Sequence, residues 1–454
     1  MARLTAIAVL LSLIGSGAQA ADFGLTRWSE DHRDLADSAT HATPLDAIKH
    51  IPLGDDPGHY LSLGGQLRMK GVAFDAPLFG LGTAGADGYW FQRLNLHGDW
   101  HAGPHLRVFA ELGDARVHSK DAPPATVDAN RSDLQLAFAD LATADSGPRL
   151  VLRIGRQELA FDSTQRFVAL REGPNVRRAY DGARLTGSAG KLEVTAFITE
   201  PVEYRDDSAF DDRNNPHLRF SGLRVRRGEP ATSYLDAYWY RYEREDALFG
   251  GIRSAELREV FGLQSAGRAG RYDWDTEALY QTGEFGRSDI RAWAFSALLG
   301  RSFSTVWNPR LALQLDLASG DRQAGDGRLE TFNPLFPRGA YFSQSGLSDF
   351  SNLVHAGLFV TARPTPRLSL GVGGGHMARQ SRADAAYAQP LLPIPRSTVD
   401  DKSIGDYLRI NASYRCNRHL SLATEMLRYI PASGLRDVGA DTADYAELVA
   451  KFLF

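Results

Sequence analysis

Apolar and polar side chains alternate with a period of two along most of this chain. In residues 150–157, Leu150, Leu152 and Ile154 share one parity, and polar or small side chains fill the other. This is the periodicity of a strand with one apolar and one polar face. The same pattern recurs in residues 60–73, 90–100, 106–112, 191–198, 311–317 and 408–415. The sequence therefore predicts an all-β protein.

The connections between these segments are alternately short and long. This feature separates a membrane barrel from a soluble sandwich, whose strands also alternate between apolar and polar residues. An outer-membrane barrel has tight periplasmic turns and long external loops. We therefore predict a transmembrane antiparallel up-and-down β-barrel of about 18 strands with a water-filled lumen. The short connections are 101–104, 143–148, 187–190, 228–231, 267–270, 304–309, 363–366 and 416–418, and the longest loops are 115–130, 200–216, 320–348 and 378–402.

The two ends of the chain fit an outer-membrane barrel. Residues 1–20 have a basic start, a short apolar run and a small-residue cleavage site, as a secretory signal peptide does. Residues 21–57 are polar and are predicted to be a periplasmic lead-in, followed by the barrel at 58–454. The final segment, 446–454, alternates and ends in Phe454. We expect the protein in the outer membrane of a Gram-negative bacterium, in contact with outer-membrane lipid.

Residues 149–184 carry a local excess of positive charge. They contain eight arginines against four carboxylates, on a chain whose formal net charge is -4. Guanidinium groups suit carboxylates and phosphates. This segment is therefore predicted to handle an anionic substrate.

Strand parity gives candidate residues for the lining of a pore. Inward cations attract anions, and inward carboxylates keep any one site from binding too tightly. The alternative is that each cation pairs with a carboxylate across the wall and only stiffens the barrel. The cationic candidates are Arg68, Lys70, Arg93, Arg107, Arg153, Arg178, Arg184 and Arg409, and the acidic ones are Glu111, Glu193, Asp236 and Asp316.

Three further features bear on the lumen. An aromatic and proline-rich piece, 332–337, interrupts the polar loop 320–348, so this loop either folds into the mouth as a gate or packs on itself. The glycine run 371–375 alternates with apolar residues and is read as a strand whose bare inner face leaves lumen space. Four tyrosines of one parity would stack on sugar rings or fill the lumen: Tyr234, Tyr238, Tyr240 and Tyr242.

Several short motifs resemble the alginate export family of outer-membrane porins. They are LGGQLR at 63–68, RIGRQEL at 153–159, Arg166, RRAYDG at 177–182 and TFNPLFP at 331–337. The resemblance covers nearly all of the predicted mature chain, with Tyr180 standing where the family often has phenylalanine. It implies an 18-stranded barrel and, in the founding type, outward passage of a polyuronate through an arginine-lined constriction narrowed by folded-in loops.

The leading functional hypothesis is export of an alginate-like polyuronate through an arginine-lined pore, a function compatible with periplasmic export partners. An uptake porin for small anions or oligouronates is the alternative, since the same lining permits it. An outer-membrane hydrolase is less favoured, because the inward His97 and His355 lie far apart in sequence without a nucleophile motif. We expect no enzyme activity, no cofactor, no metal site and no nucleic-acid partner. With Cys416 as the only cysteine, no intrachain disulfide can form.

Overall fold

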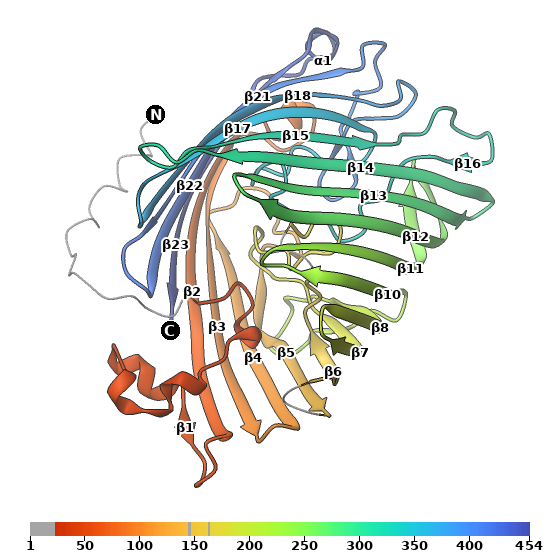
Figure 1. Cartoon of the computed structure of the whole chain (residues 1–454). Helices are drawn as coiled ribbons and strands as arrows, with labels where there is room; N and C mark the ends of the chain where they lie inside the picture. Colours follow the sequence, from red (N-terminus) through yellow and green to blue (C-terminus); the bar gives the residue numbers. More distant parts are fainter. Residues whose placement is uncertain (1–22, 144–146, 162–163) are drawn as a thin grey trace.

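Eighteen strands form a closed antiparallel barrel in which each strand pairs with the next and the last returns to the first. The computed structural model describes residues 23–454 except 144–146 and 162–163. The barrel begins with β2 and closes where β23 pairs with it, from Gln66 opposite Leu453 to Asp75 opposite Asp444. The predicted antiparallel barrel and its strand number are confirmed (Figure 1). The predicted signal peptide, 1–20, lies outside the described residues.

The strands of the barrel are long, and shorter elements decorate it. The barrel strands are β2 (His59–Asp75), β3 (Asp87–Ala102), β4 (Leu106–His118), β5 (Asn130–Ala142), β6 (Arg149–Gln157), β7 (Tyr180–Ala189), β8 (Leu192–Glu203), β10 (Leu218–Glu229), β11 (Ser233–Phe249), β12 (Ile252–Ala269), β13 (Tyr272–Phe285), β14 (Ser288–Ser302), β15 (Arg310–Ala318), β17 (Leu353–Thr365), β18 (Leu368–Ala378), β21 (Ser403–Arg415), β22 (Leu420–Pro431) and β23 (Ala443–Leu453). The short strands are β1 (Ile51–Pro52), β9 (Arg213–Asn214), β16 (Arg328–Leu329), β19 (Tyr387–Ala388) and β20 (Leu392–Pro393). The helices are α1 (Ser433–Asp437) and 3-10 turns at Arg27–Ser29, Arg33–Ala36, Ser38–Thr40, Pro44–Ile48 and Pro77–Gly80.

The barrel is apolar outside and polar inside, the inverse of a soluble protein. On β15, Leu311, Leu313 and Leu315 are each more than a third exposed, whereas Asp316 is fully buried. In a bilayer the exposed leucines would face lipid, and the inward polar groups are paired within the lumen. Among the described residues, no helix has the length and apolar character needed to cross a membrane.

Seven of the eight predicted short connections lie at one end of the barrel, where the chain also terminates, and residues 144–146 of the eighth lie outside the described residues. The opposite end holds the long loops, with two exceptions. The connections after β11 and β13 are two-residue turns. Gly250 and Gly251 have φ of 53° and 80°, the left-handed pair that a tight hairpin turn needs. At these two places the predicted short and long alternation fails.

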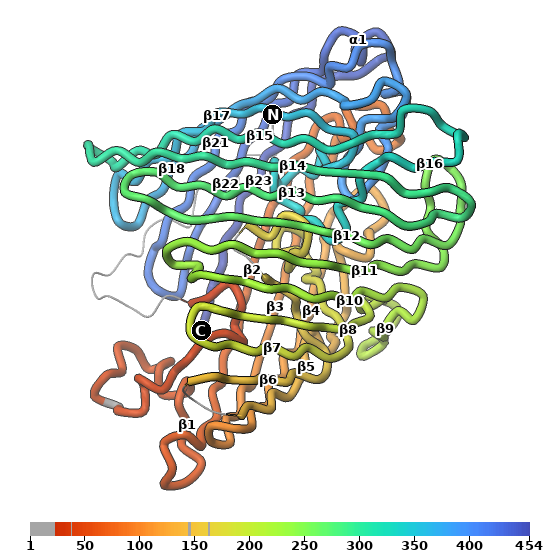
Figure 2. The backbone as a smooth tube through the Cα atoms, turned by 45° about the vertical axis from the view of Figure 1, so that its right-hand side comes forward, coloured from red at the N-terminus to blue at the C-terminus, as the bar shows by residue number. Residues whose placement is uncertain are grey.

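The lumen is occupied by the chain itself. We call residues 158–179, between β6 and β7, the lumen loop, and residues 319–352, between β15 and β17, the long loop. Both fold inward, so that segments distant in sequence lie within the ring of strands (Figures 1 and 2). The buried aromatic side chains Phe167, Phe332, Phe336 and Phe350 come from these two loops.

Candidate channel lumen

One end of the lumen loop meets a cationic wall formed by β2, β3 and β23. Glu172 accepts two hydrogen bonds from Arg93 at 2.7 and 2.8 Å and one from Lys451 at 2.8 Å. Arg68 lies 4.0 Å from the same carboxylate and donates to the carbonyls of Glu172 and Pro174 at 2.5 and 2.7 Å. These contacts fix the loop to three strands at once.

The charge on Glu172 is favoured by its surroundings. Burial alone would raise the pKa of this carboxyl, but Arg93, Lys451, Arg177 and Arg68 outweigh it and hold the pKa well below its usual range. Glu172 therefore stays ionised at neutral pH and neutralises part of the cationic wall.

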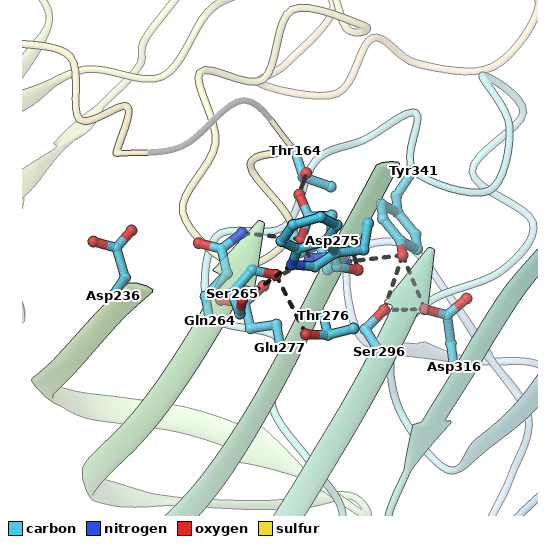
Figure 3. A network of polar contacts seen from close by, with 12 residues as sticks. Thr164, Asp236, Gln264, Ser265, Asp275, Thr276, Glu277, Ser296, Asp316 and Tyr341 are labelled. Atoms are coloured by element: carbon cyan, nitrogen blue, oxygen red, sulfur yellow. Dashed lines mark hydrogen bonds and ion pairs between the residues drawn. The ribbon is translucent and has the colours of Figure 1, made fainter. Parts of the chain in front are cut away.

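The other end of the lumen loop is fixed to an acidic wall by Arg166. This fully buried guanidinium lies 2.6 Å from Asp275 and 3.2 Å from Glu277 of β13. It also donates to the hydroxyl of Tyr341 in the long loop at 3.0 Å, and Tyr341 in turn bonds Asp316 of β15 at 2.9 Å. Figure 3 shows how this network joins both loops to the strands. The lumen loop thus crosses the barrel, with Glu172 at one wall and Arg166 at the other.

The two loops are joined to each other by backbone hydrogen bonds. Val168 and Phe336 form a parallel bridge, in which Ala169 donates to the carbonyl of Phe336 at 3.0 Å and Phe336 donates to that of Phe167 at 3.0 Å. The ring of Phe336 packs 4.9 Å from Phe220 of β10. The aromatic piece 332–337 therefore folds into the lumen, and its role as a gate stays a prediction.

A cavity of about 290 Å³ remains between the two loops and the wall of β2, β22 and β23. Five of its lining residues are cationic, and two are acidic, Glu172 and Glu447. Arg171 donates through Nε to the carbonyl of Val176 at 3.0 Å, while its Nη2 is buried without a partner among the described residues. Burial and the nearby Arg178 lower the pKa of Arg171 to about 10, as expected of a cation without a paired carboxylate. The five cations are Arg68, Lys70, Arg171, Arg338 and Lys451.

The segment before the barrel enters the mouth at the short-turn end. Arg27 donates to the carbonyls of Gly65 and Phe454 at 2.8 and 3.0 Å, across the seam where the barrel closes. The indole of Trp28 donates to Glu158 at 2.8 Å and lies under the guanidinium of Arg153, 4.4 Å from the ring centroid. The segment that the sequence predicts as a lead-in thus contacts the lumen wall, and Leu25 lines the cavity.

Most of the predicted lining residues face the lumen, but their charges are largely paired. Among those held by the loops, Lys70 lies 2.6 Å from Glu447 and 3.3 Å from the carbonyl of Gly173, and Arg409 donates to the carbonyl of Phe342. Others pair along the wall: Arg107 with Asp99 at 2.7 Å, Arg153 with Asp140 at 2.7 Å, Glu111 with Asn95 at 2.9 Å, Glu193 with Arg226 at 3.8 Å, Asp236 with Arg226 at 3.0 Å and Asp316 with His355 at 2.8 Å.

Two of the predicted cations differ from the rest. Arg178 does not belong to a strand: it lies in the lumen loop, two residues before β7, and its guanidinium lies 4.9 Å from the ring of Phe336. Strand parity was therefore the wrong reason for choosing it. Arg184 of β7 is 5.5 Å from the ring of Trp28, so its face toward the lumen is covered by the segment that precedes the barrel.

The tyrosine and glycine patterns have structural roles. All four tyrosines are inward and buried. Tyr238, Tyr240 and Tyr242 pack in one cluster with the aromatic side chains of the loops, whereas the ring of Tyr234 lies under the guanidinium of Arg226. The glycine run forms β18, as predicted, but its bare face leaves no open space. A Cβ on Gly373 would lie 2.0 Å from Phe359, and one on Gly371 would lie 2.4 Å from Asn411. Side chains of the two neighbouring strands fill the gap.

Sequence reasoning missed the residues that the loops contribute. Nothing in the sequence shows which wall Glu172 would reach, because a loop has no parity. Lys451 could have been found, since it shares the inward parity of Glu447 on the last strand. Trp28 carried no signal at all, as the segment before the barrel shows no periodicity.

The fold and this polar, partly blocked lumen define a class of protein, an outer-membrane β-barrel porin. The sequence profile of the Alginate export family matches residues 59–448, and the chain belongs to this family. No curated protein matches the sequence.

Solved outer-membrane structures share the fold at low sequence identity. OccK2 (OpdF) of Pseudomonas aeruginosa superposes with a TM-score of 0.58 at 14% identity, covering 87% of this chain and 97% of that one. It has also been solved in complex with glucuronate. OccD3 (OpdP) of the same organism gives 0.58 at 11% identity, covering 89% and 92%. A BenF-like porin from Pseudomonas fluorescens Pf-5 gives 0.57 at 12%, covering 87% and 98%.

Proposed function

We propose that this porin is an anion-selective channel for short uronates, meaning single uronic acids or short uronate oligomers. The observation that carries the proposal is the cavity beside β22 and β23, whose lining holds five cationic residues and two carboxylates. A uronate offers the carboxylate and hydroxyl groups that such a lining binds. OccK2, which has a similar fold, has been solved in complex with glucuronate, and this supports a uronate as the substrate here.

Glu172 suggests how a carboxylate would enter and leave. The carboxylate of Glu172 already occupies the position between Arg93 and Lys451. The side chains of Glu172 and Lys451 are 24% and 25% exposed. The carboxylate of an incoming uronate would displace Glu172 from these cations. Glu172 would displace the uronate in turn, and the uronate would move on. This competition keeps the uronate bound weakly enough for conduction.

Export of an alginate-like polyuronate is the second candidate, and membership of the Alginate export family favours it. The same cations would contact successive uronates of a polymer. The described lumen argues for the shorter substrate, because the bridged loops fold into it and the cavity that they leave beside β22 and β23 measures about 290 Å³. Passage of a polymer would need at least one of these elements to move.

The test is a recording of the purified protein in a planar bilayer under a salt gradient, with uronates of increasing length added to one side. We expect an anion-selective reversal potential and a block of the current by single uronates and short oligomers. A block by long polyuronate alone would favour export, and cation selectivity would overturn both proposals.

The matched variants are Lys451→Gln and Lys191→Gln. Both remove one lysine charge, but Lys451 lines the cavity, whereas Lys191 is 72% exposed beside the turn between β7 and β8. We expect a lower anion preference and a weaker uronate block in Lys451→Gln only. Equal effects of the two variants would contradict the assignment of the cavity.

A further inference from the structure

Three carboxylates converge at the long-loop end of the barrel, away from the cavity. Asp133 lies near the start of β5, and Asp211 and Asp212 lie in segment 204–212, between β8 and β9. One oxygen from each carboxylate lies within 4.8 Å of the others. Asp133 is only 3% exposed, and Asp211 and Asp212 are half-buried, so none of the three is a fully exposed surface charge.

Backbone hydrogen bonds hold the three carboxylates in this arrangement. The amide of Asp212 donates to Oδ2 of Asp133 at 3.0 Å, and the amide of Phe210 donates to the carbonyl of Ser132 at 3.1 Å. The amide of Arg205 donates to Oδ1 of Asp212 at 2.9 Å. Segment 204–212 is therefore folded against the end of β5, with its carboxylates directed at Asp133.

Two further oxygens at this place have no hydrogen-bond partner among the described residues. Asn130 is 5% exposed, and its amide nitrogen donates to Oδ2 of Asp212 at 2.7 Å, which directs the amide group into the cluster. Its Oδ1 is buried and unpartnered, and so is Oδ1 of Asp211. Buried oxygens without donors are costly unless water or a cation satisfies them.

The guanidinium of Arg156 approaches the cluster. Nη1 of Arg156 lies 4.0 Å from Asp133, but this guanidinium is already bonded to Asp181 through Nε at 2.9 Å and Nη2 at 3.0 Å. The cluster therefore keeps a negative charge that Arg156 offsets only in part.

We propose that Asn130, Asp133, Asp211 and Asp212 form a calcium site that fastens segment 204–212 to the barrel. Ca²⁺ takes carboxylate and amide oxygens in flexible geometry, whereas Zn²⁺ favours the nitrogen and sulfur ligands that this cluster lacks. Rotation of the Asn130 amide places its oxygen where its nitrogen now lies, facing Asp212. The ion would then satisfy the unpartnered oxygens and relieve the repulsion among the carboxylates.

The test is calcium titration of the full-length protein, refolded in detergent and freed of metal with a chelator, by calorimetry. We expect one saturable site with a Kd on the order of 10⁻⁴–10⁻³ M, the range of extracellular calcium modules. Asp211→Asn and Asp212→Asn should each weaken binding at least tenfold. Asp207→Asn is the control, since Asp207 is exposed on the same segment and outside the cluster.

A second readout separates binding at this site from binding elsewhere. Arg205 and Arg213 flank the two aspartates, so trypsin reports whether the segment is fastened. Calcium should slow cleavage there several-fold in the unmodified protein and in Asp207→Asn, and should not slow it in Asp211→Asn. The absence of saturable binding in the unmodified protein would overturn the proposal, as would equal affinity in Asp211→Asn and Asp207→Asn.

Discussion

The two walls of the lumen hold the same loop in different ways. At the cationic wall, the contact between Glu172 and Lys451 is open to water, with about a quarter of each side chain exposed. At the acidic wall, Arg166 is fully buried and Glu277 is 4% exposed. An ion pair in contact with water is weakened by screening and can exchange, whereas a buried pair cannot be broken without leaving a desolvated charge.

This difference separates a fixed part of the lumen from an adjustable part. The acidic wall anchors the lumen loop and the long loop through Arg166 and Tyr341. The cationic wall keeps a cavity and a surplus of positive charge. The proposed uronate exchange belongs at the cationic wall, because the carboxylate of Glu172 is partly exposed there and can be replaced at lower cost than a buried one.

Removing the buried anchor should have the largest effect. Arg166→Leu leaves Asp275 and Glu277 buried without their cation, which costs about 3–5 kcal/mol. We expect a lower free energy of unfolding, and a higher single-channel conductance as the lumen loop detaches. Arg241→Leu is the control, because Arg241 forms its ion pairs at the surface and its loss should cost under about 1 kcal/mol. Unchanged conductance in Arg166→Leu would show that this wall does not anchor the loop.

Removing the exposed contact should act on selectivity more than on stability. Glu172→Gln removes the carboxylate from the cationic wall, at a cost of about 2 kcal/mol of loop anchorage. The freed cations should move the reversal potential further toward anions. Glu229→Gln makes the same change beside a short turn and should leave the reversal potential unchanged. If both variants behave alike, Glu172 does not compete with substrate carboxylates.

A smaller effect should come from one hydroxyl of the acidic wall. Tyr238 donates a hydrogen bond to Glu277 at 2.5 Å, and Tyr238→Phe removes it while keeping the ring. A lost hydrogen bond to a buried charged group costs about 1–3 kcal/mol, visible as a lower urea midpoint. Conductance should stay the same, because Arg166 still holds the loop. Tyr272→Phe, at an exposed tyrosine, should change neither quantity.

The smallest effect should be that of pH on selectivity. The pKa of Glu172 in the folded protein lies well below its ordinary value of 4.5, so its ion pairs stabilise the loop above that value and are lost only as pH falls through the lowered pKa. Selectivity should therefore stay constant from about pH 8 to about pH 5 and change only in stronger acid. Glu172→Gln should lack the acid step. A transition near neutral pH that disappears in this variant would mean that the carboxylate is not held by cations.

The sequence alone was enough to predict the barrel. Period-two alternation fixes which side chains face lipid and which face the lumen, because neighbouring residues of a strand point to opposite sides. Leu311 and Asp316 could be assigned to opposite faces without a structure, and both assignments are confirmed. The tight turns at Gly250 and Gly286 escaped prediction, since the sequence pattern does not show at which end of the barrel a turn lies.

The interior of the lumen was decided by the tertiary structure. Strand parity identified Arg68 and Arg93 as inward residues, yet it could not show that Glu172 neutralises them from a loop 79 residues beyond Arg93. The same limit applies to Arg166, Trp28 and the aspartates of segment 204–212, all of which lie outside the barrel strands. A strand imposes a period that can be read from the chain, whereas an inward loop takes its position from contacts with distant segments that exist only once the barrel has closed.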